Sequence, residues 1–374
     1  MEFNCQLSII NSQLLIIKFG GEILLYTQKD YMKFSLIVSD YEQKKYPQPK
    51  LSLPILTTLF QHSLKQEVNI FSCSKQQGEK LIATAFDHNQ YYENRVKKTK
   101  QIFLNQDYLN NLRSRVEHEL ELCQEHNINY LGYESEEYPA PLREIDLSPI
   151  MLFYQGQLPS DEELKQSLAV VGSRNCEQYG QNIAYSAGRI LSEHGWWNIS
   201  GLATGCDTNG HWGSLEADGL TGAALAHGLA ADIYPKQNKD LAAEIIDQDG
   251  FLLSEVVPSA STAPHFFKWR DRLQSGLTRG IFIVETGKTG GTLYTANYAL
   301  RQDKQVYVWE PTTPSILPED KIEGNLMLVG LKEPSDNFKI KSQQRLNEIN
   351  SISCPRELID EFEKLQQEEL KFQF

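Results

Sequence analysis

Between Leu168 and Glu310, short apolar runs of β type alternate with segments of helical periodicity. Because parallel neighbours need a crossover that a helix supplies, this alternation predicts an α/β fold with a doubly wound parallel sheet. Ligands of such sheets lie at the carboxyl ends of the strands. The predicted strands cover 168–171, 197–199, 223–226, 251–253, 281–284 and 305–308, and the predicted helices cover 181–194, 207–217, 240–248 and 293–302.

The pattern differs on either side of this region. From residue 1 to about 101, short runs such as Leu14–Ile17 and Glu22–Tyr26 are separated by Gly or by Pro-bearing stretches, which predicts a smaller N-terminal domain that contains strands. Apolar residues at i, i+4, i+8 and i+11 predict an amphipathic helix over 109–126, and a tail helix is expected from Pro355. The expected domains are 1–105, of unknown type, 106–335, with the parallel sheet, and 336–374, a helical tail.

Charge and cysteine content narrow the possible partners. The 36 Lys and Arg residues against 49 Asp and Glu give 36 − 49 = −13, so a nucleic-acid site must be a local basic patch. The six cysteines form no CxxC pair, so we expect neither a disulfide framework nor a metal site, and no motif implies a cofactor. There is no cation before Lys18 and no apolar run of about 20 residues, so we expect a cytoplasmic protein without membrane contact.

Two basic segments stand out in this acidic chain. Residues 266–279 combine Lys268, Arg270, Arg272 and Arg279 with Phe266, Phe267 and Trp269, a composition that pairs neutralisation of phosphates with stacking of bases. Residues 95–100 also carry four cations, but a solvated linker or helix face is favoured there over a nucleic-acid arm.

Several familiar chemistries are excluded by their motifs. Gly287-Lys288-Thr289 is not the end of a P-loop, because Phe282 stands where that loop requires Gly, and the chain has no GxGxxG, HExxH or GxSxG. The turn at Gly172-Ser173-Arg174 fits either a phosphate or a plain strand-to-helix turn. Asp207, at the end of the next Gly-rich turn, fits a helix N-cap.

Ordered motifs from Tyr130 to Val329 resemble those of the DprA family, also called Smf. The main ones are Ala169–Arg174, Ser200–Asp207, Arg270–Arg272 and Gly290–Thr292. The resemblance implies an extended Rossmann-like domain that binds and protects single-stranded DNA, forms a homodimer and loads the RecA recombinase during transformation and recombination. The same resemblance suggests a dimer surface around residues 229–234 and 245–253.

The chain also departs from that family. Asp271 replaces the neutral amide of the family's RNR triplet, and it either repels phosphate or pairs with Arg270 or Arg272. The family's helical N-terminal module and its C-terminal winged helix are not apparent in the pattern. These departures suggest a divergent member, for instance one with a role in phage defence.

We therefore predict a single-stranded DNA-binding protein that is not an enzyme. A nucleotide-binding sensor and an enzyme like the nucleoside-monophosphate phosphoribohydrolases remain alternatives, although Thr295 stands where those enzymes carry a glutamate. The residues expected to contact DNA or phosphate are Gly172, Ser173, Arg174, Ser200, Gly201, Gly205, Lys268, Arg270, Arg272, Gly290, Gly291 and Thr292. The candidates for stacking on bases are Phe267 and Trp269, each of which fits a place in the core equally well.

Overall fold

A computed structural model describes residues 7–10, 14–19, 22–23, 25–43, 51–86, 92–310, 318–335, 338, 340 and 343–371. The chain divides into two compact units. Unit 1 comprises Met1–Tyr138, Leu147–Phe153 and Glu255–Ala260. Unit 2 comprises Pro139–Asp146, Tyr154–Ser254 and Ser261–Phe374. The predicted ranges 1–105, 106–335 and 336–374 follow different boundaries and stay a prediction.

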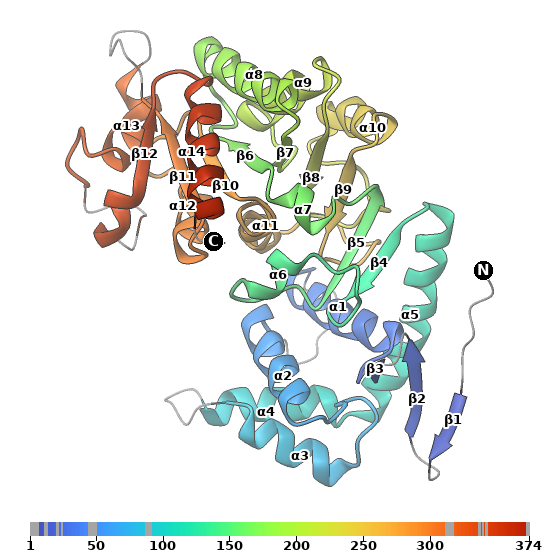
Figure 1. Cartoon of the computed structure of the whole chain (residues 1–374). Coiled ribbons are helices and arrows are strands. Elements are labelled where there is room, and N and C mark those ends of the chain that lie inside the picture. The colour runs from blue at the N-terminus through green and yellow to red at the C-terminus, as the bar shows by residue number, and fades with distance from the viewer. Residues whose placement is uncertain are drawn as a thin grey trace. The chain divides into compact units, whose positions relative to one another are not determined.

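Unit 2 is built on a parallel sheet whose strands alternate with helices (Figure 1). Within unit 2 the strand order is β12-β11-β10-β6-β7-β8-β9, and all of these pairs are parallel. The sheet continues with β5 and β4, of which β4 and the first residues of β5 belong to unit 1. The parallel order confirms the doubly wound α/β fold and all six predicted strands. Their bounds are β6 Ser167–Val171, β7 Trp197–Ser200, β8 Thr221–Ala224, β9 Phe251–Ser254, β10 Gly280–Ile283 and β11 Gln305–Trp309; the further strands are β4 Asn129–Gly132, β5 Met151–Gly156 and β12 Ile349–Ile352.

The four predicted helices of this region are also present, each within three residues of its expected bounds. They are α8 Gln178–Glu193, α9 Cys206–Leu215, α10 Lys239–Asp247 and α12 Thr292–Arg301. A fifth, α11, covers Pro264–Leu277, a segment in which the sequence pattern showed basic and aromatic residues but no assigned helix. The remaining helices of unit 2 are α6 Ala140–Glu144, α7 Asp161–Leu164, α13 Glu319–Leu328 and α14 Glu357–Lys371, with 3-10 turns at Lys236–Asn238 and Gln343–Glu348.

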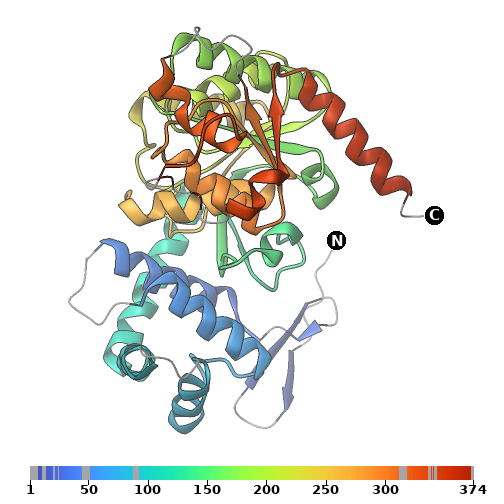
Figure 2. The same ribbon diagram turned by 90° about the vertical axis from the view of Figure 1, so that its left-hand side faces the viewer.

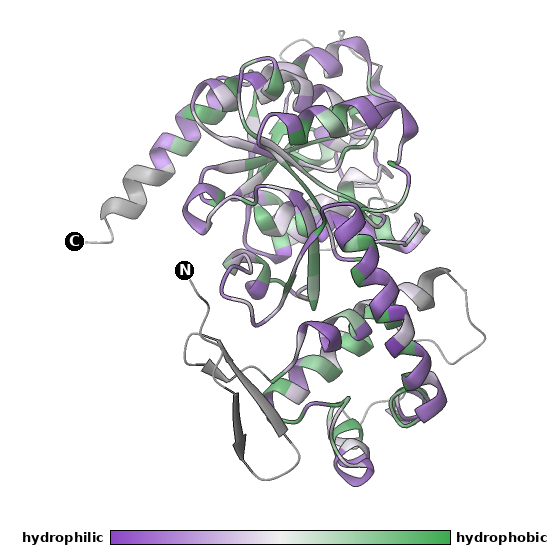
Figure 3. Ribbon diagram, turned by 90° about the vertical axis from the view of Figure 1, so that its right-hand side faces the viewer, coloured by the Kyte–Doolittle hydropathy of each residue, from purple (hydrophilic) through white to green (hydrophobic). Residues whose placement is uncertain are grey.

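The sheet is covered on both faces, and β6 shows how. Its side chains alternate, so that Leu168 and Val170 belong to one apolar core and Ala169 and Val171 belong to another. The first core includes residues of α8 and α14, the long red helix of Figure 2, and the second includes residues of α12. Hydrophobic colouring follows the strands in Figure 3. The predicted helical tail is thus part of unit 2.

Unit 1 is mainly helical. Three short antiparallel strands, β1 Leu7–Ile10, β2 Leu14–Phe19 and β3 Glu22–Ile23, agree with the expected strands. The expectation that no helical N-terminal module exists is wrong, because α1 to α5 follow. Pro54 lies in the first turn of α2, where its missing N–H costs no helical hydrogen bond, so this Pro does not separate elements. The helix bounds are α1 Gln28–Gln43, α2 Leu53–Lys65, α3 Lys75–Thr84, α4 Tyr92–Phe103 and α5 Gln106–Glu125.

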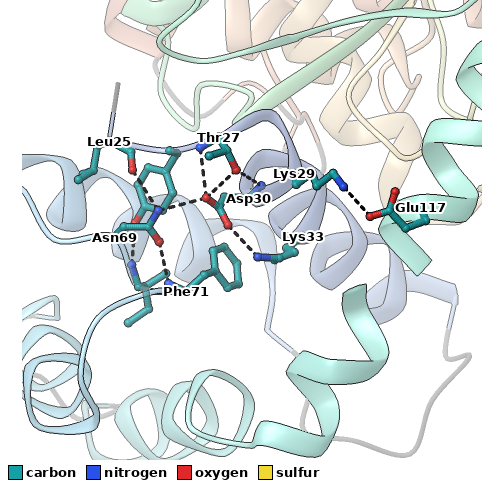
Figure 4. A network of polar contacts seen from close by, with 10 residues as sticks. Leu25, Thr27, Lys29, Asp30, Lys33, Asn69, Phe71 and Glu117 are labelled. Carbon is teal, nitrogen blue, oxygen red and sulfur yellow. Dashed lines mark hydrogen bonds and ion pairs between the residues drawn. The ribbon is translucent and has the colours of Figure 1, made fainter. Parts of the chain in front are cut away.

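A polar network fixes the start of α1 (Figure 4). Oδ2 of Asp30 accepts hydrogen bonds from Thr27 N at 3.1 Å and from Asn69 Nδ2 at 3.2 Å, and Oδ1 accepts one from Lys33 Nζ at 2.8 Å. Burial opposes ionisation of Asp30, but the hydrogen bond and charge of Lys33 hold its pKa below the usual value. The carboxylate therefore ties the start of α1 to the loop that carries Asn69.

In the described part of the chain, no helix combines the length and the apolar character that a membrane span requires.

Candidate nucleic-acid interface

Three loops meet where β6, β7 and β10 end. The loop after β6 lies between the other two, because Ser173 N donates to Glu285 O at 2.7 Å and Cys206 N donates to Ser173 O at 3.2 Å. Thr204 Oγ1 adds a bond to Arg174 O at 3.0 Å. The parallel order of the strands places these carboxyl ends at one edge, as the sequence pattern predicts.

The glycines of these loops allow close packing of backbone. Gly205 has φ +79°, and a Cβ there would overlap the Ser173 carbonyl. A Cβ at Gly172 would lie 2.5 Å from Cys206 Sγ. Loop closure therefore accounts for both glycines without a ligand, although Gly172 and Gly205 remain partly exposed.

Asp207 organises the second loop. The N-cap of α9 is Gly205, so Asp207 lies inside the first helical turn, and its Oδ2 accepts hydrogen bonds from Gly201 N at 3.1 Å and Ala203 N at 3.3 Å. Its side chain is buried, and this desolvation raises its pKa against the opposing charges of Arg270 and Arg174. Asp207 holds the loop closed rather than facing a ligand.

Arg270 is buried and links the carboxyl ends of β7 and β8. Its side chain is about 5% exposed; Nη1 donates to Ala224 O at 3.2 Å, and Nε lies 3.2 Å from Asp271 Oδ1. Of the two interpretations of Asp271, the ion pair with Arg270 is therefore the one present. Burial raises the pKa of Asp271 to about 6, although Arg270 opposes the shift. A Cβ at Gly201 would overlap Arg270, so this glycine makes room for the guanidinium.

Three more of the expected contact residues also lie inside unit 2. Arg272 is 0% exposed and its Nη1 donates to Trp269 O at 2.6 Å, while Trp269 packs on Phe266 with ring centroids 5.7 Å apart. Ser200 Oγ donates to Val170 O at 2.7 Å. Helix α11 turns Arg270, Arg272 and Trp269 inward, so Trp269 takes the core position that was its alternative, and contact of the two arginines with DNA stays a prediction.

The exposed face of this region carries a different set of residues, which we call the aromatic platform: Arg174, Tyr234, Phe267, Lys268 and Tyr294. The Arg174 guanidinium lies 4.9 Å from the centroid of the Phe267 ring, a cation–π distance. Phe267 in turn contacts Tyr234 edge to face at 5.5 Å, and Tyr234 is 45% exposed. Lys268 Nζ lies 4.9 Å from the Tyr294 ring. Each of the two cations of the platform thus lies over an aromatic ring.

Tyr234 and Tyr294 were not among the expected site residues. His227 orients the first of them, because its Nε2 accepts a hydrogen bond from Tyr234 N at 3.2 Å. No periodicity in the sequence connects Tyr234 with α11. Only the fold brings Tyr234 and Phe267 together.

The third loop ends at the start of α12. Gly291 is its N-cap and is exposed, with no atom within 4 Å of an added Cβ, while Thr292 is buried. Gly290 N donates to Gly287 O at 3.1 Å and closes the turn. Leu293 N donates to Gly290 O at 3.3 Å and Tyr294 N to Gly291 O at 2.9 Å, so it is the positive end of the helix dipole that is compatible with an anion here.

Two residues bear on the alternative that the chain is an enzyme, Glu285 and Thr295, and both are buried. Glu285 is 0% exposed, and its Oε2 accepts a hydrogen bond from Glu177 N at 3.1 Å. Thr295 is buried as well. Among the described residues, no group of three or more His, Cys, Asp or Glu side chains could hold a metal ion.

The family-specific sequence profile "DNA recombination-mediator protein A" matches residues 129–332, more than half of the chain. The chain belongs to the DNA recombination-mediator protein A family. Within this DprA/Smf family, the chain is 33% identical over 183 residues to the DNA processing protein DprA of Bacillus subtilis, covering 49% of this chain and 61% of that protein. It is 33% identical over 202 residues to protein Smf of Escherichia coli, covering 54% and 53%.

The chain spans between half and two thirds of the length of these curated relatives. Among solved structures, DprA of Streptococcus pneumoniae has a TM-score of 0.60 at 21% identity, covering 89% of this chain and 98% of that one. Residues 129–374 are fewer than 89% of the chain, so the common DprA fold includes part of the helices of unit 1. A DprA structure of Helicobacter pylori, whose study concerns single-stranded DNA binding, has a TM-score of 0.51 at 20% identity and covers 64% of this chain and 98% of its own.

The residues suggested as a dimer surface of this DprA/Smf member fall into two groups. Ile245, Phe251 and Leu253 are buried within unit 2, whereas residues 230–234 are half-buried or exposed, with Tyr234 45% exposed. Self-association stays a prediction.

Proposed function

We propose that this chain binds single-stranded DNA through the aromatic platform. The observation that carries the proposal is the exposed Arg174 guanidinium over the Phe267 ring, next to the exposed ring of Tyr234. A guanidinium neutralises backbone phosphate, and an aromatic ring stacks on a base of any sequence. The platform thus combines the two contacts that a polynucleotide without a partner strand requires.

The preference for single strands follows from the rings. In duplex DNA the base faces are stacked on one another, so a surface ring gains contact only with strands whose bases are free. The cations would bind either form. We therefore infer that selectivity comes from Phe267 and Tyr234, and that Arg174 and Lys268 supply affinity.

The wider role that we propose is the family's: protection of incoming single strands and their transfer to the RecA recombinase in transformation or recombination, with the protein acting as a homodimer. Membership of the recombination-mediator family supports it, as does the name of the Helicobacter pylori study. We propose no catalytic step, since Glu285 and Thr295 are both buried and Glu285 is hydrogen-bonded within the loops.

The deciding experiment is a binding titration of the full chain with single-stranded and duplex DNA of equal length at two salt concentrations. We expect tighter binding of the single strand at both. Phe267→Leu should reduce this preference, whereas the matched surface variant Leu331→Ala, at another exposed apolar side chain, should not. Equal affinity for single-stranded and duplex DNA at matched salt would refute the proposal.

A further inference from the structure

Helix α4 of unit 1 carries an exposed basic face. Lys97 and Lys98 are exposed, and Arg95 and Lys100 are half-buried. The opposite face consists of the buried residues Thr99, Ile102 and Phe103. The lysines are thus held outward by a helix whose other side is fixed in the core of unit 1.

Nothing in the described part of the chain neutralises this face. No ion pair involves Arg95, Lys97, Lys98 or Lys100 there, whereas surface lysines elsewhere do pair, as in Lys165 with Glu162 at 2.6 Å and Lys364 with Glu361 at 2.5 Å. The single acidic residue of α4 is Glu93. The positive charge of the helix therefore remains available to a ligand.

Charge is also segregated within unit 1. Helix α3 packs against α4 (Figure 1) and carries the exposed Lys75 and Lys80. The acidic residues gather instead towards the end of α5, where they include the exposed Glu117, Glu121 and Glu125. In a chain of net charge −13, a helix with four cations and the single acidic residue Glu93 is a local exception that an anionic polymer fits.

We propose that the α4 face, defined as Lys97, Lys98 and Lys100, is a second contact for nucleic acid that binds the phosphate backbone of a long strand; Arg95 lies on the buried stripe of Thr99 and Ile102 and is not part of this face. The assignment of DNA as its ligand rests on the proposed function of unit 2. No aromatic ring is exposed on the described α4, since Phe103 is buried and Tyr92 is half-buried with its hydroxyl donating to Ala83 O at 2.9 Å. The α4 face therefore distinguishes neither one base from another nor single-stranded from duplex DNA.

The test compares two lengths of single-stranded DNA, about 8 and about 40 nucleotides, with the full chain; the shorter is of the size that one single-strand site covers. In the variant Lys97→Gln/Lys98→Gln/Lys100→Gln, we expect the salt slope on the long strand to fall by about 2, at about 0.7 for each lost phosphate contact, and the affinity to fall roughly tenfold. On the short strand we expect no change. The matched control Lys165→Gln/Lys332→Gln/Lys364→Gln removes the same charge from lysines that are already paired.

The outcomes separate this inference from the function of unit 2. If the α4 variant retains the wild-type slope on the long strand, the α4 contact is refuted. A loss of binding in Arg174→Gln would in that case still support the proposed role of the aromatic platform. If Arg174→Gln binds as wild type and the α4 variant loses slope, the α4 contact stands and the platform fails. For a duplex of 40 base pairs the slope should fall by about 2.7, at about 0.9 for each lost contact, and a loss restricted to single strands would contradict a backbone contact without stacking. An unchanged unfolding midpoint verifies that the variant is folded.

Discussion

The guanidinium of Arg270 fills the space that a side chain at position 201 would need. Gly201 and Arg270 therefore depend on each other. Because Gly201 has no Cβ, the buried guanidinium of Arg270 fits beside it and reaches the Ala224 carbonyl and Asp271. The sequence motifs contain both residues, but as two separate candidates for contact with phosphate. Their packing instead shows how the carboxyl ends of β7 and β8 are joined.

Gly201→Ala should destabilise unit 2. The added methyl group displaces the guanidinium from its hydrogen bond and from Asp271, and breaking a buried ion pair costs about 3–5 kcal/mol. Urea unfolding followed by circular dichroism measures the change. Gly291→Ala is the control, because a Cβ there meets no atom within 4 Å, and its free energy of unfolding should stay within about 0.5 kcal/mol of wild type. Equal midpoints for Gly201→Ala and wild type would show that Arg270 moves without cost.

A substitution at Arg272 should reduce the stability of unit 2, whereas a substitution at Lys268 should weaken DNA binding without changing stability. Arg272 is fully buried, so Arg272→Met should lower the free energy of unfolding by about 1–3 kcal/mol, through groups left without their hydrogen bonds. Lys268 is exposed, so Lys268→Gln should leave stability unchanged and reduce the salt slope of single-stranded DNA binding by about 0.7. Unfolding and titration of both variants check this. A stable Arg272→Met that binds DNA poorly would return Arg272 to the interface.

Periodicity predicted the sheet of unit 2 well, since a strand buried on both faces is an uninterrupted apolar run. The failure at α11 has a specific cause. The composition of this segment indicates a basic and aromatic surface, but composition does not show which side of a helix each residue occupies. On a helix, Phe266, Trp269, Arg270 and Leu273 fall at i, i+3, i+4 and i+7, which is one buried stripe. Phe267 and Lys268 remain outside it, half-buried and exposed respectively.

The contacts within the aromatic platform could not be predicted from the sequence, for a different reason. Arg174, Tyr234 and Phe267 come from three loops or helices far apart in the chain, and only the order of the parallel strands brings them together. In unit 1, Pro-bearing stretches do not separate elements throughout, since the first turn of a helix accepts Pro, as Pro54 in α2 shows.

Glu285 should make unit 2 less stable as the pH rises. Burial raises the pKa of Glu285 to about 7, above its ordinary value, so the protonated form is favoured in the folded state. The stability that it contributes is present below the unfolded pKa and is lost as the pH rises through about 7; by linkage the loss is on the order of 3 kcal/mol.

Glu285→Gln should remove most of this dependence between pH 5 and pH 8, since its amide oxygen can still accept the hydrogen bond from Glu177 N. Urea unfolding of wild type and variant at a series of pH values measures it. Glu121→Gln, at an exposed carboxylate, is the control for the change in net charge. Parallel pH profiles for wild type and Glu285→Gln would contradict the assignment.

Arg174 and Phe267 should leave different signatures in DNA binding. Arg174→Gln removes one phosphate contact, so the salt slope for single-stranded DNA should fall by about 0.7. Phe267→Leu removes a stacking ring, so affinity should fall by about 1–3 kcal/mol at every salt concentration without a change of slope.

The two effects should not add. Phe267 also holds the guanidinium of Arg174 at 4.9 Å, so losing the ring frees that side chain as well. The double variant Arg174→Gln/Phe267→Leu should therefore lose less affinity than the sum of the single losses, by about 0.5 kcal/mol or more. Lys165→Gln is a control for the slope, because this lysine is exposed and paired with Glu162. Strict additivity would show that the cation–π contact does not persist when DNA binds, and a slope change in Phe267→Leu alone would place that ring against the backbone rather than the bases.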